Sequence, residues 1–502
     1  MWPRRALPFS RLLPSLICAG AILASAPAAA VEYVAVDAAS VLNTGTANGA
    51  RLGINTDYWW DHQANRVAGA RTLPAALTEM GATYWRYPGG EKSDGYLWST
   101  PPFDAPNPRL ARISSQDWPS NDPAYWRPSA SASGTWAHPP YDFDTFMADC
   151  KAGRCTPVMV VAYDGIYKPA FPDGTSLTRQ QALDAAKAWV RYANIVRGYG
   201  IRYWEIGNET SIPGYMGGDP GRRQQAADVV AFCGAMKQAD PSILCGVYAR
   251  SKADWTTLLA GAGPEIGFLS VHAYDAYTFA GYPDYAGADL DPIGAIDAAW
   301  SALQGYPEHR DRIKIAVTET GGLTFGVVGN WTQGDLGHAL MTLDMLAQFQ
   351  QDARVAFTQF WNTRWVQQNA AGNIWPNYIG SESDALKPDN TLAPQGIAVS
   401  LLSRFSLERM VATTSTATVR AFASHDPESG RLNVWLINKS MAETSTELTL
   451  NQYAPRPATV TALSGAGPDD LFPVYRAKSS VAPVGNRLIL TLDPTSITVL
   501  QF

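Results

Sequence analysis

The stretch "YWEIGNETS" (203–211) determines how the middle of this chain is interpreted. Its apolar run reaches Ile206 and then stops at Gly-Asn-Glu, so Asn208 and Glu209 stand where a strand ends. An isolated Asn-Glu pair would be taken as an ordinary turn that faces water. The neighbouring segments decide whether these two side chains instead belong to a site that several strands share.

Seven other segments have the same character, a short β-rich apolar run, and helical periodicity follows most of them. The eight expected strands are "LGINT" (52–56), "TYWRYPGG" (83–90), "PVMVVAYDG" (157–165), "RYWEIGNE" (202–209), "ILCGVYA" (243–249), "GFLSVHAY" (267–274), "KIAVTETG" (314–321) and "VAFTQFWNT" (355–363). The alternation predicts an α/β fold, a (β/α)8 TIM barrel over residues 51–406. An open doubly wound sheet is the alternative, but no G-x-G-x-x-G follows the first strand, which disfavours its dinucleotide-binding form.

The pattern changes after about residue 405. Five segments alternate polar and apolar residues at period two, with turn residues between them: 419–425, 431–439, 445–453, 487–493 and 496–502. They predict a C-terminal antiparallel β-sandwich over residues 407–502. The β-like segment "VEYVAVDAAS" lies within residues 31–50, ahead of the first barrel strand, and is a candidate to lend a strand to that sandwich.

Residues 1–30 are predicted to be a secretory signal peptide. Three arginines precede an apolar stretch at 12–23, and the triplet Ala28-Ala29-Ala30 offers an A-x-A cleavage site. The apolar stretch is too short to span a bilayer comfortably, so no membrane span is expected after signal removal. The mature protein is therefore predicted to be secreted or periplasmic.

The remaining chain holds four cysteines, an even number that permits disulfides in an exported protein. We favour Cys150–Cys155 and Cys233–Cys245, because each pair would join a helix to the strand that follows it. Four buried thiols are the alternative. No C-x-x-C motif occurs, so a structural zinc site is not expected.

The composition narrows the class of partner. Hydrophobic residues make up 46% and charged residues 17% of the 502 residues, which is typical of a globular protein with a large core. The formal charge of −6 gives no basic signature, so nucleic acid is not an expected partner. The 17 Trp and 22 Tyr offer flat apolar faces with a polar edge, which suit sugar rings as well as a protein core.

One connection, residues 89–140, is unusually long for a compact domain. It carries six large aromatic residues among Pro and Ser: Tyr96, Trp98, Trp118, Tyr125, Trp126 and Trp136. Aromatic residues in this number argue against disorder. The connection is either a substrate wall, in which Trp98 is a candidate contact, or a structural loop held by its own aromatic side chains.

A barrel gives the Asn-Glu pair a role, because catalytic groups in this fold sit at the C-terminal ends of the strands. Glu209 ends the fourth expected strand and Glu319 ends the seventh. These strands lie on roughly opposite sides of the barrel mouth, so the two carboxyls can face each other across a cleft. One carboxyl could then protonate a glycosidic oxygen while the other attacks the anomeric carbon.

A fourth-strand Asn-Glu with a seventh-strand Glu resembles glycoside hydrolase clan A, the retaining (β/α)8 glycosidases. The resemblance extends over the whole mature chain, since several families of the clan append a β-sandwich. It implies that Glu209 is the acid/base, Glu319 the nucleophile and Asn208 the partner of the substrate 2-hydroxyl. It also implies a polysaccharide or oligosaccharide substrate and neither a cofactor nor a metal.

Further positions match the clan pattern as substrate-binding candidates. They are Arg86, which would bond the nucleophile, His272 and Tyr274 after the sixth strand, and Trp361, which would floor the sugar site. Trp59, after the first strand, could stack on a sugar or pack a helix. Each has a structural alternative: a rim salt bridge for Arg86, a satisfied core histidine for His272 and simple packing for Trp361.

The family within the clan stays open. "RYPGGEKSDGYLW" (86–98) resembles the corresponding stretch of the α-L-arabinofuranosidases, with related stretches in the xyloglucanase/endoglucanase and β-glucuronidase/heparanase groups. "VTETGG" (317–322) departs from the arabinofuranosidase pattern and is closer to the β-glucuronidase/heparanase group. The substrate could therefore be an arabinofuranoside, a β-glucan or xyloglucan, or a glucuronide.

Two other classes of protein compete with this interpretation. A metal-dependent barrel hydrolase would also place carboxylates at strand ends, but the six His show neither an H-x-H nor an H-E-x-x-H pattern. A non-catalytic carbohydrate-binding barrel could keep the aromatic residues but would not need both Glu209 and Glu319. No pattern in the sequence predicts an oligomeric state.

Overall fold

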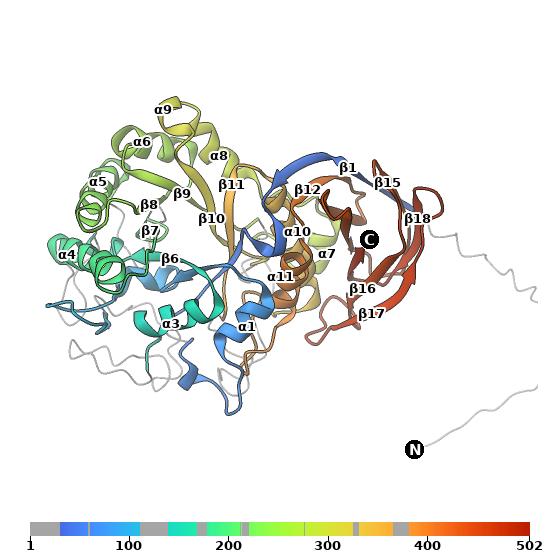
Figure 1. Cartoon of the computed structure of the whole chain (residues 1–502), viewed down its shortest axis with the longest axis horizontal. Helices are drawn as coiled ribbons and strands as arrows, with labels where there is room; N and C mark the ends of the chain where they lie inside the picture. The colour runs from blue at the N-terminus through green and yellow to red at the C-terminus, as the bar shows by residue number, and fades with distance from the viewer. Residues whose placement is uncertain are drawn as a thin grey trace, which may run out of the picture.

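The structure, a computed structural model, describes residues 31–58, 61–110, 139–167, 178–210, 212, 220–275, 277–324, 331–364 and 381–502. The expected signal peptide at 1–30 lies outside these residues. Within the described ranges, no helix combines the length and the apolar character that crossing a membrane requires. A barrel and a β-sheet domain stand side by side (Figure 1).

Eight parallel strands close the barrel in the order β10-β11-β2-β3-β6-β7-β8-β9. Their bounds are β2 (Leu52–Asn55), β3 (Tyr84–Tyr87), β6 (Thr156–Val161), β7 (Tyr203–Ile206), β8 (Leu244–Tyr248), β9 (Ile266–Ala273), β10 (Lys314–Thr320) and β11 (Val355–Phe360). Each overlaps one of the eight expected segments, so the predicted (β/α)8 barrel is confirmed.

One longer helix follows each strand, and these helices surround the barrel (Figure 1). They are α1 (Leu73–Met80), α3 (Phe143–Gly153), α4 (Arg179–Val190), α5 (Arg222–Ala239), α6 (Lys252–Ala262), α8 (Gly294–Leu303), α10 (Leu336–Gln351) and α11 (Pro394–Phe405), with the shorter α7 (Tyr282–Gly287) and α9 (Pro307–Arg310) between α6 and β10. Local sequence fixes several starts: Thr178 with Gln181, and Ser251 with Asp254, form capping boxes at α4 and α6.

The barrel interior is layered because strand side chains alternate between the inside and the outside. The bottom layer is apolar and draws on seven of the eight strands; it consists of Val158, Phe268, Ala316 and Phe357, with Tyr84, Tyr203, Leu244 and Ala356 packed against them. Two residues further along β3 and β7 stand Arg86 and Glu205, at 0% and 1% exposure. The layer above the apolar one is therefore charged, and it supports the mouth.

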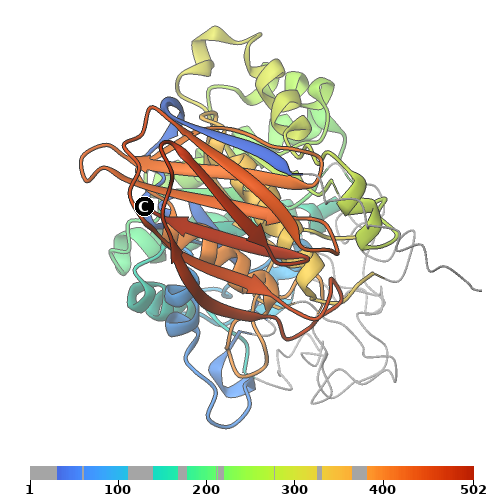
Figure 2. The ribbon, with the colours of Figure 1, turned by 90° about the vertical axis from the view of Figure 1, so that its right-hand side faces the viewer.

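The second domain is a nine-stranded sheet in the order β17-β16-β19-β14-β13-β12-β1-β15-β18 (Figure 2). Its strands are β1 (Glu32–Thr44), β12 (Arg409–Thr414), β13 (Val419–Asp426), β14 (Arg431–Asn438), β15 (Thr444–Asn451), β16 (Ala458–Ser464), β17 (Val474–Val481), β18 (Arg487–Leu492) and β19 (Ser496–Gln501). The segment expected to lend a strand is β1, which pairs antiparallel with β12 and parallel with β15.

This sheet folds over a core of its own. Val460 of β16, near one edge of the sheet, shares a buried cluster with Leu448 of β15 and Leu488 of β18, at the opposite edge. Two halves of the sheet therefore face each other, as the predicted antiparallel sandwich requires, and the prediction of this fold is confirmed. The strands that the sequence did not predict are β12, β16 and β17.

Helices α10 and α11 lie between the barrel and the sheet (Figure 1). The Trp435 indole of β14 donates a hydrogen bond to the Leu401 carbonyl of α11 at 2.9 Å. Arg420 of β13 donates to the buried Asp344 of α10 at 3.3 Å. These contacts attach the sheet to the side of the barrel, away from the open end at which the strands finish.

Both disulfides are present with the expected pairing, Cys150–Cys155 and Cys233–Cys245. The first joins α3 to the residue that precedes β6, and the second joins α5 to β8. Each bond therefore ties an outer helix to the barrel strand that follows it, which limits the conformations open to the unfolded chain.

Candidate active site

The ends of five barrel strands bring the candidate side chains together. Arg86 comes from β3, Asn208 and Glu209 follow β7, His272 and Tyr274 come from the end of β9, Glu319 from β10, and Trp361 follows β11. A methyl group added at Gly90 would lie 2.6 Å from Glu319 Oε1 and 2.7 Å from Trp361 Cη2. Only glycine, which has no Cβ, can lie so close to these two side chains, and the shared contact shows that Trp361 and Glu319 are neighbours.

Arg86 is the centre of the hydrogen-bond network. Its Nη1 donates to Glu319 Oε1 at 2.7 Å and to Asn55 Oδ1 at 2.9 Å. Its Nη2 donates to Asn208 Oδ1 at 2.8 Å and to Glu205 Oε2 at 2.6 Å, and its Nε donates to the same Glu205 oxygen at 2.9 Å. A guanidinium has five N–H groups, and these contacts use all of them. Arg86 therefore orients Glu319 and Asn208 and has no donor left for a substrate.

A bulge aims Glu319 into the site. The pairing of β10 with β9 shifts in register between Val317 and Glu319. Thr318 bonds Ser270 inside the barrel, and the next residue, Glu319, also faces inward, where it accepts hydrogen bonds from Arg86 and from the Tyr274 hydroxyl at 2.9 Å. Strict alternation would have turned one of these two residues outward, so the bulge re-aims the carboxylate.

Glu209 is held by a strained turn. Its φ is 50°, the left-handed region that side chains with a Cβ rarely adopt, and Gly207 precedes it with a φ of 73°. A Cβ at Gly207 would also come within 2.9 Å of the Tyr163 ring. The backbone N–H of Asn208 donates to Asp94 Oδ1 at 3.2 Å. Residues in such conformations cluster at functional sites, where surrounding contacts hold them.

The two carboxyls are close and differ in their partners. One oxygen of Glu209 and one of Glu319 lie within 4.8 Å of each other. His272 Nδ1 lies 2.8 Å from Glu209 Oε1 and 3.4 Å from Glu319 Oε2. Glu319 receives two further donors, Arg86 and Tyr274, whereas within the described residues the one hydrogen bond of the Glu209 carboxyl joins it to His272.

These surroundings push the pKa values away from those of free glutamates. Burial raises the pKa of Glu209 to about 7, against a smaller opposing effect of the Arg86 and Arg250 charges. Burial also raises the pKa of Glu319, but the Arg86 charge and the Arg86 hydrogen bond oppose that rise. Glu209 is therefore the carboxyl that can hold a proton near neutral pH.

His272 is neutral in this environment. Burial lowers its pKa to about 4, although the nearby Glu319 charge acts in the opposite direction. A neutral imidazole carries one N–H, and we assign it to Nδ1, because that nitrogen faces oxygens of both glutamates. Tyr248 packs against the ring with a centroid distance of 4.5 Å. His272 thus supplies a hydrogen bond to the carboxyls without supplying a charge.

Two aromatic candidates do not join this cluster. Trp98 is 1% exposed, stacks on Trp189 at 6.0 Å between ring centroids, and donates from its indole to the Ala185 carbonyl at 2.9 Å. It is a core residue with its polar edge already satisfied, so the prediction that it contacts substrate was wrong. Trp59 lies outside the described residues, as do residues 111–138 of the long connection.

Sequence reasoning passed over two residues of the network, Glu205 and Asn55. Glu205 stands within the stretch first considered, "YWEIGNETS", but the motif drew attention to its last residues. The signal was available, because a carboxylate two residues after Tyr203 in a buried strand points into the barrel and must have a partner there. Asn55 ends β2 and pairs in register with Arg86 of β3.

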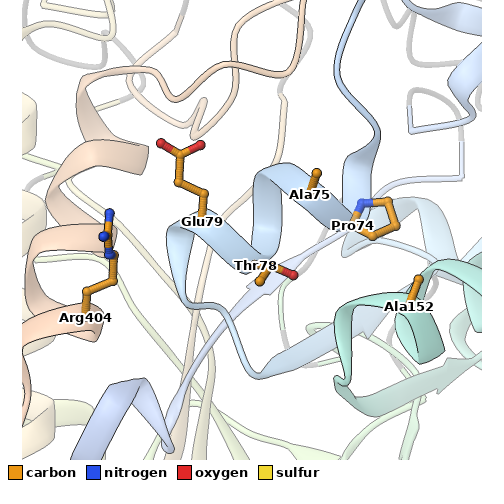
Figure 3. Close-up of a pocket in the computed structure, with 6 residues that line it drawn as sticks. All are labelled: Pro74, Ala75, Thr78, Glu79, Ala152 and Arg404. Atoms are coloured by element: carbon orange, nitrogen blue, oxygen red, sulfur yellow. The ribbon is translucent and has the colours of Figure 1, made fainter.

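A separate depression of about 650 Å³ lies on the outside of the barrel (Figure 3). It is lined by Pro74, Ala75, Thr78 and Glu79 of α1, Ala152 of α3 and Arg404 of α11. Glu79 forms an ion pair with Arg71. The lining contains none of the residues at the strand ends, and it offers no pair of carboxyls that could act on one bond.

Comparisons with known proteins bear on this geometry. No protein-family model matches the chain. A curated sequence from Aspergillus terreus, a probable α-L-arabinofuranosidase C, is 27% identical over 230 residues. The match covers 40% of this chain and 39% of that relative, so it spans well under half of either protein.

Solved structures resemble the chain over nearly its full length. An α-L-arabinofuranosidase from Thermotoga maritima, in an arabinose complex, has a TM-score of 0.64 at 16% identity and covers 93% of this chain and 99% of its own. A family 51 α-L-arabinofuranosidase from Bifidobacterium longum has a TM-score of 0.66 at 14% identity, with 94% and 99% covered. A family 44 xyloglucanase from Paenibacillus polymyxa has a TM-score of 0.58 at 14% identity, with 93% and 98% covered.

The predicted resemblance to these glycosidases is confirmed at the level of the fold. At identities this low the likeness shows a shared fold, which in this chain is a barrel with an appended sheet domain. The chemistry is argued from the residues at the strand ends of this chain.

Proposed function

We propose that this protein is a retaining glycoside hydrolase in which Glu209 is the acid/base and Glu319 is the nucleophile. The observation that carries the proposal is the pair of buried carboxyls with oxygens within 4.8 Å and with unequal partners. Retaining enzymes hold their two carboxyls about 5–5.5 Å apart, whereas inverting enzymes need about 6.5–9.5 Å to admit a water molecule. The short spacing supports double displacement.

The partners of each carboxyl support the proposed roles. Glu319, with the Arg86 guanidinium 2.7 Å away, is the better group to stay ionised and attack the anomeric carbon. Glu209, with a pKa of about 7, can protonate the leaving oxygen and then, once ionised, remove a proton from the water that releases the sugar. Tyr274 and His272 hold the two carboxyls in place, and Trp361, beside Glu319, is the candidate aromatic contact for the sugar.

The substrate class proposed first is the α-L-arabinofuranosides of oligosaccharides or polysaccharides. The curated relative and two of the solved structures described above are α-L-arabinofuranosidases, and "RYPGGEKSDGYLW" favours the same group. β-Glucans and xyloglucan are the second class, because the family 44 xyloglucanase shares the fold. Glucuronides are the third, on the strength of "VTETGG" alone.

A substrate screen tests the proposal. Aryl α-L-arabinofuranoside, β-glucoside, β-xyloside and β-glucuronide would be assayed with arabinan, arabinoxylan and xyloglucan, and proton NMR would follow the anomeric configuration of the first product. We expect release from one class with net retention. Release of free arabinose would support exo action on side chains, and release of oligosaccharides would support an endo-glucanase. No release from any substrate would overturn the proposal.

A metal-dependent hydrolase is the second candidate function, and one observation favours it. Glu209, His272 and Glu319 place one potential ligand atom each within 4.8 Å of one another. Against it, Arg86 and Tyr274 already donate to both oxygens of Glu319, and the guanidinium charge would repel a cation there. Dialysis against a strong chelator separates the two: a double-displacement enzyme keeps its activity, and a metal hydrolase loses it until a divalent cation is returned.

Export from the cytoplasm also belongs to this proposal. The two disulfides are typical of oxidising compartments, and the first thirty residues have the composition of a signal peptide. Mass spectrometry of the protein recovered from the medium or the periplasm would locate the N-terminus. We expect it near Val31, and a retained Met1 would contradict cleavage.

A further inference from the structure

The charged layer beneath the mouth contains a carboxylate that the proposed mechanism does not use. Glu205 is 1% exposed and lies on β7, below the Asn208–Glu209 turn. Its Oε2 accepts two hydrogen bonds from Arg86, at 2.9 and 2.6 Å. Its other oxygen is buried and has no hydrogen-bond partner within the part of the chain that the structure describes.

Glu205 and Glu319 share one counter-charge. Arg86 lies 2.6 Å from a Glu205 oxygen and 2.7 Å from a Glu319 oxygen, and it is fully buried. Asn55 and Asn208 accept the remaining N–H groups of Arg86 without adding charge. One cation, Arg86, therefore lies between two carboxylates: Glu319 at the candidate site and Glu205 below it in the barrel.

We infer that Glu205 is a positioning residue that fixes the Arg86 guanidinium and neutralises it, so that Arg86 can orient Glu319 and leave it a strong nucleophile. This inference rests on the proposed role of Glu319. A carboxylate that faces an uncompensated buried cation becomes less basic, and a less basic carboxylate is a weaker nucleophile. The negative charge of Glu205 offsets part of the attraction that Arg86 exerts on the Glu319 carboxylate. The two hydrogen bonds on one side of the guanidinium also fix its plane, which aims Nη1 at Glu319.

Few other groups near Glu319 can titrate over the relevant range. The pKa of Tyr274 is raised well above its ordinary value, first by burial and then by the Glu319 charge. The pKa of His272 is about 4 and that of Glu209 is about 7, so neither group produces an acid limb of kcat/KM that lies between these two values. The acid limb of kcat/KM therefore reports the ionisation of Glu319 beside Arg86, a carboxyl whose pKa is raised by burial.

Substitutions that change the charge around Arg86 test the inference. Glu205→Gln removes one negative charge at nearly constant shape, so the acid limb of kcat/KM should move to lower pH by about one unit, with a slower glycosylation step. Asn55→Asp adds a carboxylate at an atom 2.9 Å from Nη1 and should move the same limb to higher pH. The double variant, Glu205→Gln with Asn55→Asp, exchanges one carboxylate for another. The net charge around Arg86 is then unchanged, and the limb should return to near its original position.

A matched control separates charge from general damage. Asp344 is a buried carboxylate that accepts from Arg420 at the contact between α10 and the sheet. Asp344→Asn should lower the melting temperature and leave the pH profile unchanged. Circular dichroism would verify that each variant folds, and if Glu205→Gln did not fold, the upward shift in Asn55→Asp would still be required.

The outcomes distinguish this inference from the proposed function. A wild-type protein that hydrolyses no glycoside in the screen contradicts the proposed function itself. An active wild-type protein whose acid limb stays in place in both single variants, or moves in the same direction in both, contradicts the role of Glu205 alone. Opposite shifts that cancel in the double variant would support it.

Discussion

The assignment of roles to the two glutamates can be tested by removing each in turn. Glu209→Ala deletes the group that is proposed to protonate the leaving oxygen and later to activate water. Loss of one acid/base group costs about 10²- to 10⁴-fold in rate, and the larger cost is expected for natural substrates, whose leaving groups are poor. With an activated aryl glycoside the first step needs no proton, so this variant should form the glycosyl-enzyme rapidly and then stall.

The pKa of Glu209 sets the expected pH dependence. The acid must be protonated when the substrate arrives, and its pKa is about 7, so wild-type kcat/KM should fall as the pH rises through 7, by about tenfold per unit above it. The nucleophile must be ionised, so kcat/KM should also fall on the acid side. In Glu209→Ala with an activated substrate, the alkaline limb should disappear and the acid limb should remain.

The product formed with azide shows on which face of the sugar ring each glutamate acts. In Glu209→Ala, azide can enter the vacated space and attack the glycosyl-enzyme, which gives a glycosyl azide with retained configuration. In Glu319→Ala no glycosyl-enzyme can form, and azide in place of the carboxylate would attack the substrate directly with inversion. Glu79→Ala, at an exposed glutamate of α1, is the matched control and should behave as the wild type.

NMR of the glycosyl azides decides the assignment. Retained product from Glu319→Ala together with inverted product from Glu209→Ala would show that the roles are reversed. Full activity in either variant on a natural substrate would show that the variant residue is neither the nucleophile nor the acid/base.

Three further substitutions test individual contacts. Tyr274→Phe removes the 2.9 Å hydrogen bond to Glu319 and should lower kcat about tenfold or more, since a hydrogen bond to a charged group contributes about 1.5–3 kcal/mol. The acid limb of the pH profile should also move to higher pH. An unchanged limb would mean that the bond is absent in solution. Gly90→Ala adds a methyl group 2.6 Å from Glu319 Oε1, so activity should fall while thermal unfolding changes little, and full activity would contradict the close approach. Trp98→Ala should cost about 3–5 kcal/mol of stability and leave KM unchanged, and a raised KM with an unchanged melting temperature would restore Trp98 as a substrate contact.

The barrel could be predicted because its strands are buried on both faces. Such strands appear in the sequence as nearly continuous apolar runs. The strand β17 was missed for the opposite reason: all of its side chains are exposed or half-buried, so no alternation marks it. The role of Trp98 was misjudged because a tryptophan in a long connection gives the same signal in the sequence whether its ring faces a sugar or stacks on Trp189.

The details of the site depended on information that the sequence does not contain locally. The bulge between Val317 and Glu319 is a property of the pairing between β10 and β9, and it turns Glu319 inward beside Thr318. The ion pair of Glu205 with Arg86 joins residues 119 positions apart. Sequence patterns predicted which strand ends carry the candidate residues, and only the register of the closed barrel determines which side chains meet.

Burial alone cannot give the two catalytic candidates different roles, because Glu209 and Glu319 are almost equally buried, at 8% and 5% exposure. Desolvation raises the pKa of each. The difference arises from what the barrel places beside them. Strand β3 gives Glu319 a cation, and β9 gives it the Tyr274 hydroxyl, while Glu209 faces an imidazole that carries no charge at neutral pH. The unequal distribution of charged and neutral donors between two otherwise similar carboxyls is what would allow the proposed acid and the proposed nucleophile to work at the same pH a few ångströms apart.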